Sequence, residues 1–170
     1  MIQAQLLGTR IISSSADAFT LCEKSCFGEK LANKIVYSSI ESLFLLSEGK
    51  MVVFSGKKKL DEDSLAKKLK KFDKKIETKS LVYNNLRKKG YIPKTALKYG
   101  AEFRVYEKGA KPGESHARWI LYTVKENELI SWHDFAAKNR IAHSVKKTLL
   151  IAIVDEEGDV SYYEIAWIKP

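Results

Sequence analysis

Short apolar runs alternate with segments of helical apolar spacing along the first half of the chain. Residues 3–12, 18–21 and 51–54 are short and rich in apolar side chains, a pattern that predicts strands. Residues 38–49 predict a helix that a serine caps at its start and that Gly49 closes in the left-handed conformation. The first half therefore mixes strands with helix.

A lysine-rich amphipathic helix is predicted over residues 61–76. Its apolar residues recur at helical spacing and form one inward stripe, namely Leu65, Leu69, Phe72 and Ile76. Residues 57–79 contain ten lysines against five acidic residues, an excess of five positive charges. A solvated helix face accounts for such a run, and a surface that binds a polyanion is the alternative. The pattern breaks around residues 73–80, where we place a boundary between domains of residues 1–78 and 79–170.

A new helix over residues 81–90 opens the second half, which continues with short runs rich in aromatic and β-branched residues. Of these, residues 103–107 and 119–124 predict strands. Ser131 can cap a helix that runs to about Val145, with an inner face formed by Trp132, Phe135, Ala142 and Val145. These elements predict an α/β (α+β) protein with a small N-terminal mixed α/β domain and a C-terminal mixed β-sheet flanked by helices.

The C-terminal segment predicts a hairpin. Two apolar runs, residues 149–154 and 160–168, flank the acidic turn 155–159, where Gly158 supplies the positive φ that the turn needs. The second run is apolar on both of its faces. Such a strand is either buried on both sides or part of a subunit interface.

The charge of the chain narrows the class of partner. Its 170 residues include 30 Lys and Arg against 21 Asp and Glu, giving a formal net charge of +9 and a pI of about 9.4. This favours a polyanion, either nucleic acid or an anionic membrane surface. No run approaches the roughly 18 apolar residues of a membrane span, and the N-terminus lacks the layout of a signal peptide. We therefore expect a cytoplasmic protein that acts without a membrane.

Few residues stand out as catalytic groups. The chain has no phosphate-binding glycine loop, no histidine pair at metal-binding spacing and no nucleophile elbow. Cys22 and Cys26 have no second pair to complete a zinc site, so we expect neither a metal nor a cofactor. What remains is a loop rich in glycine and proline that follows Tyr106 and ends at His116. Without further evidence, Tyr106 is interpreted as a packed strand residue and His116 as a surface residue.

Three spaced motifs change that interpretation. They are residues 97–109 (LKYGAEFRVYEKG), 115–116 (SH) and 142–155 (AHSVKKTLLIAIVD). From about residue 81 to the C-terminus the chain closely resembles the catalytic subunit of the archaeal tRNA-splicing endonuclease, also called tRNA-intron endonuclease. The resemblance implies that residues 79–170 are the nuclease domain.

The same resemblance implies a Tyr–His–Lys triad at Tyr106, His116 and Lys147, and an RNA-binding role for Arg140, whose guanidinium would clamp a bulged base. An exposed helix arginine is the alternative for Arg140. The implied reaction is excision of introns from precursor tRNA at both splice sites of a bulge-helix-bulge motif. It leaves 2′,3′-cyclic phosphate and 5′-hydroxyl ends and needs no metal.

The residue types suit that chemistry. Attack by a 2′-hydroxyl needs a base, an acid for the departing oxygen and a positive charge on the phosphorane. An imidazole titrates near neutrality and can serve as the acid, whereas a phenol is a poor base unless a cation lowers its pKa. For Tyr106 a purely orienting role therefore stays open. A non-catalytic structural subunit or an RNA-binding module of the same fold is the alternative for the whole chain.

Assembly is the last expectation that the resemblance carries. In the family an acidic loop joins two dimers, and the matching positions here are Asp155, Glu156, Glu157 and Asp159. The implied assembly is a homotetramer, and a heterotetramer with a separate structural subunit is the alternative. On spacing alone, these residues fit a solvated hairpin turn.

Overall fold

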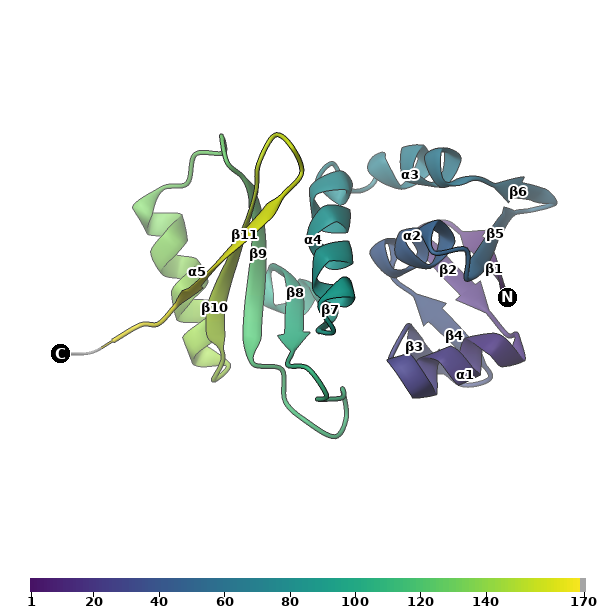
Figure 1. Ribbon diagram of the computed structural model, residues 1–170, viewed down its shortest axis with the longest axis horizontal. Helices are drawn as coiled ribbons and strands as arrows, with labels where there is room; N and C mark the ends of the chain where they lie inside the picture. The colour runs from purple at the N-terminus through teal and green to yellow at the C-terminus, as the bar shows by residue number, and fades with distance from the viewer. Residues whose placement is uncertain (169–170) are drawn as a thin grey trace. The chain divides into compact units, whose positions relative to one another are not determined.

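The structure, a computed structural model, describes residues 1–168 and divides into two compact units, Met1–Ser80 and Leu81–Pro170. Both units combine helices with a mixed β-sheet, so the predicted α/β class is confirmed (Figure 1). Within residues 1–168 no helix has both the length and the apolar character that crossing a membrane requires.

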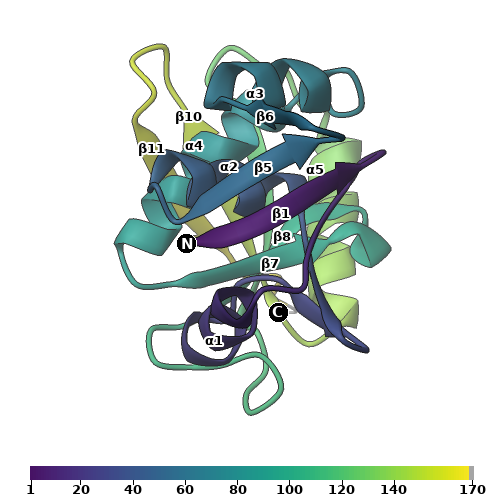
Figure 2. The ribbon, with the colours of Figure 1, turned by 90° about the vertical axis from the view of Figure 1, so that its right-hand side faces the viewer.

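The first unit is built on a six-stranded sheet in the order β3-β4-β2-β1-β5-β6. Its strands and helices are β1 (Ile2–Leu7), β2 (Arg10–Ser13), α1 (Ala16–Ser25), β3 (Glu29–Leu31), β4 (Lys34–Tyr37), α2 (Ser39–Ser47), β5 (Met51–Ser55), β6 (Lys58–Leu60) and α3 (Glu62–Lys70). The strands β1 and β5 lie side by side and run in the same direction, whereas the other pairs are antiparallel (Figure 2).

Local chemistry explains where helix α2 begins. The Ser38 side chain accepts a hydrogen bond from the Glu41 backbone N–H, and the Glu41 carboxylate accepts one from the Ser38 backbone N–H. This reciprocal capping box satisfies two donors that a helix start leaves unpaired. A second Glu41 oxygen accepts from the N–H of Gly28 at 3.0 Å, so the same carboxylate also fixes the segment before β3.

Two predictions for the first unit are wrong. The segment 18–21 is part of helix α1 and forms no strand. Phe72 does not belong to an inward stripe, because α3 ends at Lys70 and the Phe72 side chain is 67% exposed. Leu65 and Leu69 are buried on α3 as predicted. Ile76 is also buried, but it begins the next helix, Ile76–Lys88, so the single helix predicted over residues 61–76 is broken.

The second unit has a five-stranded sheet in the order β11-β10-β9-β8-β7. Helix α4 (Ile76–Lys88) leads into the elements β7 (Ile92–Ala96), η1 (Leu97–Tyr99), β8 (Ala101–Tyr106), β9 (Trp119–Lys125), α5 (Trp132–Ser144), β10 (Thr148–Val154) and β11 (Val160–Ile165). Only β9 and β10 are parallel, and α5 connects them.

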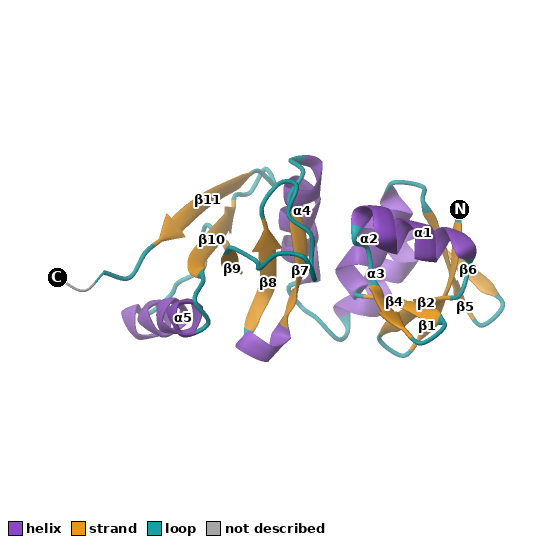
Figure 3. Ribbon diagram, turned by 90° about the horizontal axis from the view of Figure 1, so that it is seen from below, coloured by secondary structure: helices purple, strands orange, loops and turns teal. Residues whose placement is uncertain are grey.

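Helices cover both faces of this second sheet (Figure 3). Ala142 of α5 packs in one buried cluster with Ile120, Leu149 and Ile151. On the other face the Tyr83 ring of α4 contacts the Phe103 ring at a centroid distance of 5.8 Å. The central strands β9 and β10 are therefore buried on both sides.

The predicted inner face of α5 is only partly right. Ala142 is buried, but Trp132 is 84% exposed because it is the first residue of the helix. In the C-terminal hairpin, Gly158 has the expected positive φ of 87°. Strand β11 lies at the sheet edge with Tyr163 55% exposed, so burial on both sides within one chain is excluded for this strand.

Candidate active site

Three strand termini meet at one end of the second sheet, where β8 ends and β9 and β10 begin. We call this end of the strands the starting edge. Strand β8 is antiparallel to β9, and β9 is parallel to β10, so the end of β8 lies beside the starts of β9 and β10. In register, Val105 pairs with Trp119, and Trp119 pairs with Thr148. Tyr106 directly follows Val105, and Lys147 directly precedes Thr148.

The backbone of Arg118 connects these strand ends. Its N–H donates to the Val105 carbonyl, and its own carbonyl accepts from the Thr148 N–H, both at 3.0 Å. His116 lies two residues earlier on the same segment. The structure thus brings the backbones of all three triad candidates to one edge of the sheet.

The three candidates differ in burial. Tyr106 is the last residue of β8 and is only 5% exposed, whereas Lys147 is half-buried and His116 is exposed. Tyr106 and Lys147 are therefore at least partly buried beside the sheet, whereas His116 lies on an exposed part of a loop.

That loop, residues 107–116, is folded by short-range hydrogen bonds. The Ala110 N–H donates to the Glu107 carbonyl, and the Ser115 N–H donates to the Lys111 carbonyl at 2.9 Å. Gly109 and Gly113 adopt φ values of 80° and 94°, a region that glycine enters without steric cost. The glycines that marked the loop in the sequence thus allow two tight turns ahead of His116.

A left-handed turn places Lys147. The N–H of Lys146 donates to the His143 carbonyl, and the N–H of Lys147 donates to the Ala142 carbonyl, both at 2.9 Å. This pair of bonds is a Schellman motif, with Lys146 in the left-handed position at φ 56°. Helix α5 stops there, and the chain enters β10 one residue later. Lys146 caps the helix in solvent, whereas Lys147 faces a more buried setting.

Tyr99 is a residue near the triad that the sequence did not single out. Its pKa is lowered, first by a side-chain hydrogen bond from Lys98 and further by the charges of Lys98, Lys147 and Arg104. The charge of Lys147 therefore acts on the phenol of Tyr99. The only signal in the sequence is the position of Tyr99 within the motif that precedes β8.

The other predicted residues lie away from this edge or on its approach. Arg140 is exposed near the end of α5, seven residues before Lys147. The acidic turn 155–159 follows the opposite end of β10, which puts it roughly 23 Å from Lys147 at about 3.3 Å per residue over seven residues.

Within the acidic turn the four carboxylates are not equivalent. Asp155 accepts a hydrogen bond from the Asp159 N–H at 2.8 Å and so shapes the turn itself. The side chains of Glu156, Glu157 and Asp159 are exposed. A further carboxylate, that of Glu126, accepts from the Glu156 N–H at 3.0 Å.

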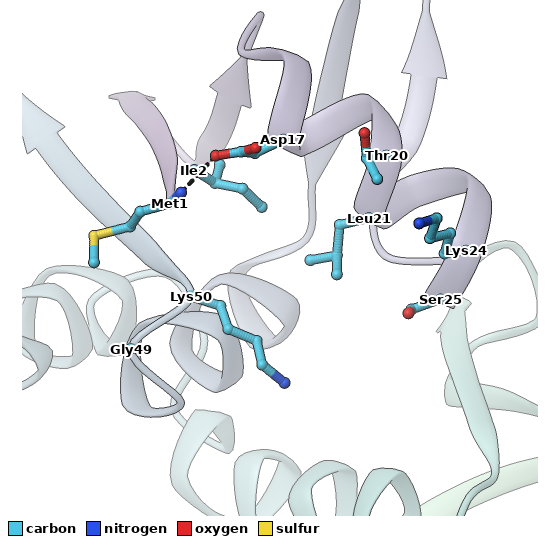
Figure 4. A pocket seen from close by; sticks show the side chains of 9 residues that line it. All are labelled: Met1, Ile2, Asp17, Thr20, Leu21, Lys24, Ser25, Gly49 and Lys50. Atoms are coloured by element: carbon cyan, nitrogen blue, oxygen red, sulfur yellow. Dashed lines mark hydrogen bonds and ion pairs between the residues drawn. The ribbon is translucent and has the colours of Figure 1, made fainter.

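A pocket of about 480 Å³ lies in the first unit, far along the chain from every predicted site residue. Figure 4 shows the N-terminal ammonium paired with Asp17 at its rim, with the Lys24 and Lys50 side chains nearby. The chemistry of the triad candidates therefore does not coincide with this hollow.

Comparison with known proteins gives the same result for both units. Residues 76–162 match the family model described as tRNA intron endonuclease, catalytic C-terminal domain, and residues 2–66 match its N-terminal domain. The chain is 38% identical to the tRNA-splicing endonuclease of Thermococcus kodakarensis over 99% of both chains. It is 40% identical to that of Thermococcus onnurineus over 99% of this chain and 97% of the relative, and 36% identical to that of Methanothermobacter thermautotrophicus over 96% of both.

Proposed function

The chain belongs to the tRNA intron endonuclease family, and from that premise we propose that it excises introns from precursor tRNA by cutting both splice sites of a bulge-helix-bulge motif. The observation that supports the proposal most is the meeting of the Tyr106, His116 and Lys147 backbones at one sheet edge, held by the Arg118 hydrogen bonds.

The proposed reaction breaks the RNA with its own 2′-hydroxyl. Tyr106 takes the proton of that hydroxyl, and the 2′-oxygen attacks the adjacent phosphorus. The bond from phosphorus to the 5′-oxygen breaks as His116 donates a proton to that oxygen. Lys147 stabilises the extra negative charge of the phosphorane. The products are a 2′,3′-cyclic phosphate and a 5′-hydroxyl, and the three side chains supply every catalytic function without a metal.

The role of Tyr106 has a stated alternative, in which the buried phenol orients the 2′-hydroxyl and does not remove its proton. Burial of Tyr106 suits a fixed orienting group, whereas removal of the proton from the 2′-hydroxyl needs a base. A Tyr106→Phe variant separates the two by the pH dependence of cleavage, since only loss of a base removes a pH-dependent limb.

Assembly follows from the need for two cuts. One chain carries one triad and an intron has two ends, so we propose a homotetramer with two working sites. Strand β11 offers an unpaired sheet edge with exposed Tyr163, which suits pairing with a second copy. The exposed carboxylates of Glu156, Glu157 and Asp159 suit a basic pocket on another copy, and Arg140 suits a bulged base. A heterotetramer with a structural subunit is the alternative.

One experiment tests the reaction. The purified chain is incubated with an intron-containing precursor tRNA in excess EDTA, and the ends of the fragments are analysed. We expect cleavage at both splice sites, a cyclic phosphate on each upstream fragment and a 5′-hydroxyl that polynucleotide kinase labels directly. Cleavage that stops in EDTA and returns with a divalent ion, while the RNA fold stays unchanged, contradicts metal independence. Tight binding without any cleavage supports the non-catalytic alternative.

A further inference from the structure

Arg118 makes a set of side-chain contacts beside the triad that the proposed reaction does not use. Its Nη1 lies 2.6 Å from Glu107 Oε1, and its Nη2 lies 3.4 Å from both Glu164 oxygens. Its guanidinium stacks on the Trp119 ring with the Cζ atom 4.7 Å from the ring centroid. The Trp119 Nε1–H donates to Glu164 Oε2 at 2.6 Å, which closes the network.

The positions of these residues show which parts of the fold the network connects. Glu107 directly follows Tyr106, and Arg118 lies two residues after His116, so their ion pair closes the base of the loop that carries His116. Glu164 belongs to β11, whose backbone pairs with β10. The Glu164 carboxylate therefore adds a link from the edge strand to the start of β9.

These contacts are better suited to fixing a geometry than to stabilising the fold. The side chains of Arg118, Glu107 and Glu164 are each about half-exposed, and ion pairs in such settings contribute little to stability. A guanidinium held by two carboxylates and an aromatic ring has a defined orientation that a lysine does not reproduce. The hydrogen bond to Glu107 and the charge of Glu164 raise the pKa of Arg118 further above its ordinary value, and a guanidinium is charged at any working pH.

We propose that Arg118 is a positioning residue, which holds the His116 loop in its reactive position by joining Glu107 at the loop base to Glu164 and Trp119. The proposal rests on the function proposed above. A general acid must lie within hydrogen-bond reach of the leaving oxygen, and a displacement of about 1 Å costs up to about 10²-fold in rate.

The test uses single-turnover cleavage at saturating enzyme together with RNA affinity. For Arg118→Gln we expect cleavage about 10-fold slower with the dissociation constant unchanged within about twofold, since the acid is misplaced and the binding surface is kept. Arg118→Lys keeps the charge but lacks the planar fork, so it should not restore the rate. Recovery of both rate and affinity by lysine would assign Arg118 to direct phosphate contact and overturn the proposal.

Coupling between the partners gives a second readout. Glu107→Gln should slow cleavage by up to a similar factor, and the double variant with Arg118→Gln should be no slower than Arg118→Gln alone within about twofold, because the Arg118–Glu107 interaction is already lost in that single variant. Multiplying effects would show that the two residues act independently and would also overturn the proposal. If Arg118→Gln fails to fold, Glu107→Gln and Glu164→Gln carry the test.

A matched control lies in the first unit. The Lys70–Glu77 ion pair has a similar length, 2.7 Å, and similar exposure, so Lys70→Gln removes a comparable surface contact. We expect its cleavage rate to equal that of the wild type. His116→Ala distinguishes the two levels of failure. If it is inactive while Arg118→Gln cleaves at the wild-type rate, only the positioning role is wrong, whereas an active His116→Ala contradicts the proposed triad.

Discussion

In both sheets a parallel pair of strands is flanked by antiparallel partners. In the first unit β1 and β5 are parallel, and β6 returns antiparallel to β5. In the second unit β9 and β10 are parallel, and β11 returns antiparallel to β10. Each sheet thus has an edge where two strands begin together and a hairpin at the other end.

The two starting edges differ in what else reaches them. At the first, β2 ends beside the start of β1 and continues after two residues into helix α1, and Met1 and Lys50 line the pocket at the starts of β1 and β5. At the second, β8 ends beside the two strand starts and a ten-residue loop leads from it towards β9. A parallel pair offers two fixed strand starts, and the additional loop brings a third group, His116, towards them. The comparison indicates that the loop makes the difference between a plain edge and a candidate active site.

The largest expected effect concerns the two hairpins. The hairpin after β5 is basic, with Lys57 in its turn and Lys58 at the start of β6, whereas the turn after β10 is acidic. Replacing Glu156, Glu157 and Asp159 with Lys should split the proposed tetramer into dimers and reduce cleavage to background, because the charges that would dock on another copy are reversed. Asp155 is kept because it accepts the hydrogen bond that shapes the turn. Light scattering and single-turnover cleavage are measured together.

The control reverses the charge of the other hairpin. Lys57→Glu with Lys58→Glu should leave the mass of the assembly unchanged. A triple acidic variant that stays tetrameric, or a wild type that is monomeric and fully active, would show that the acidic turn has no part in assembly.

The next effect is that of His116, the proposed general acid, which has no counterpart in the first unit. His116→Ala should slow single-turnover cleavage by about 10²- to 10⁴-fold and leave RNA binding nearly intact. His133→Ala is the control, since this histidine is exposed in the first turn of α5. If binding and cleavage fell together in His116→Ala, the residue would be structural.

Equivalent lysines allow a direct test of the two edges. Lys147 and Lys50 each directly precede the second strand of a parallel pair. Lys147→Met should slow cleavage by about 10²- to 10³-fold, the usual effect of removing one group that stabilises transition-state charge, whereas Lys50→Met should have no effect on the cleavage step. Equal losses would mean that both lysines act only through the overall positive charge.

The smallest effect tests the turns that end the helices. Lys146 after α5 and Cys26 after α1 both adopt the left-handed conformation, with φ values of 56° and 57°. Replacing either with Gly should stabilise the fold by roughly 0.5–1 kcal/mol, since relief of the steric cost exceeds the added entropy of the unfolded chain. Urea unfolding measures the change, and Ala at the same positions should give no gain.

The pattern of the sequence predicted the fold class, which the structure confirms. The residues of the candidate active site were named only through the family resemblance. Periodicity located the buried residues Leu65, Leu69 and Ala142, because the inner face of a helix follows from spacing alone. It failed for Phe72 and Trp132, because spacing does not show where a helix ends or starts relative to its sheet. The segment 18–21 was predicted as a strand because four residues cannot distinguish a strand from a piece of helix.

The approach of the triad candidates could not be read from the pattern. Tyr106 and Lys147 are 41 positions apart, and what joins them is the register of β8, β9 and β10 with Arg118 between them. Register depends on pairing between segments that are distant in the sequence, and the hydropathy pattern contains almost no information about that pairing. The motif resemblance named these residues, and the hydrogen bonds of Arg118 show how their backbones come together.

Strand β10 also limits the insertions and deletions that the chain can tolerate. It is buried on both faces and bonded to a neighbour on each side, so one inserted residue would turn every following side chain to the opposite face. Such an insertion would also shift the acidic turn relative to Lys147. We therefore expect length variation among natural relatives to occur in loop 107–116 and to be absent from β10. The constant length of β10 fixes the distance between Lys147 and the acidic turn.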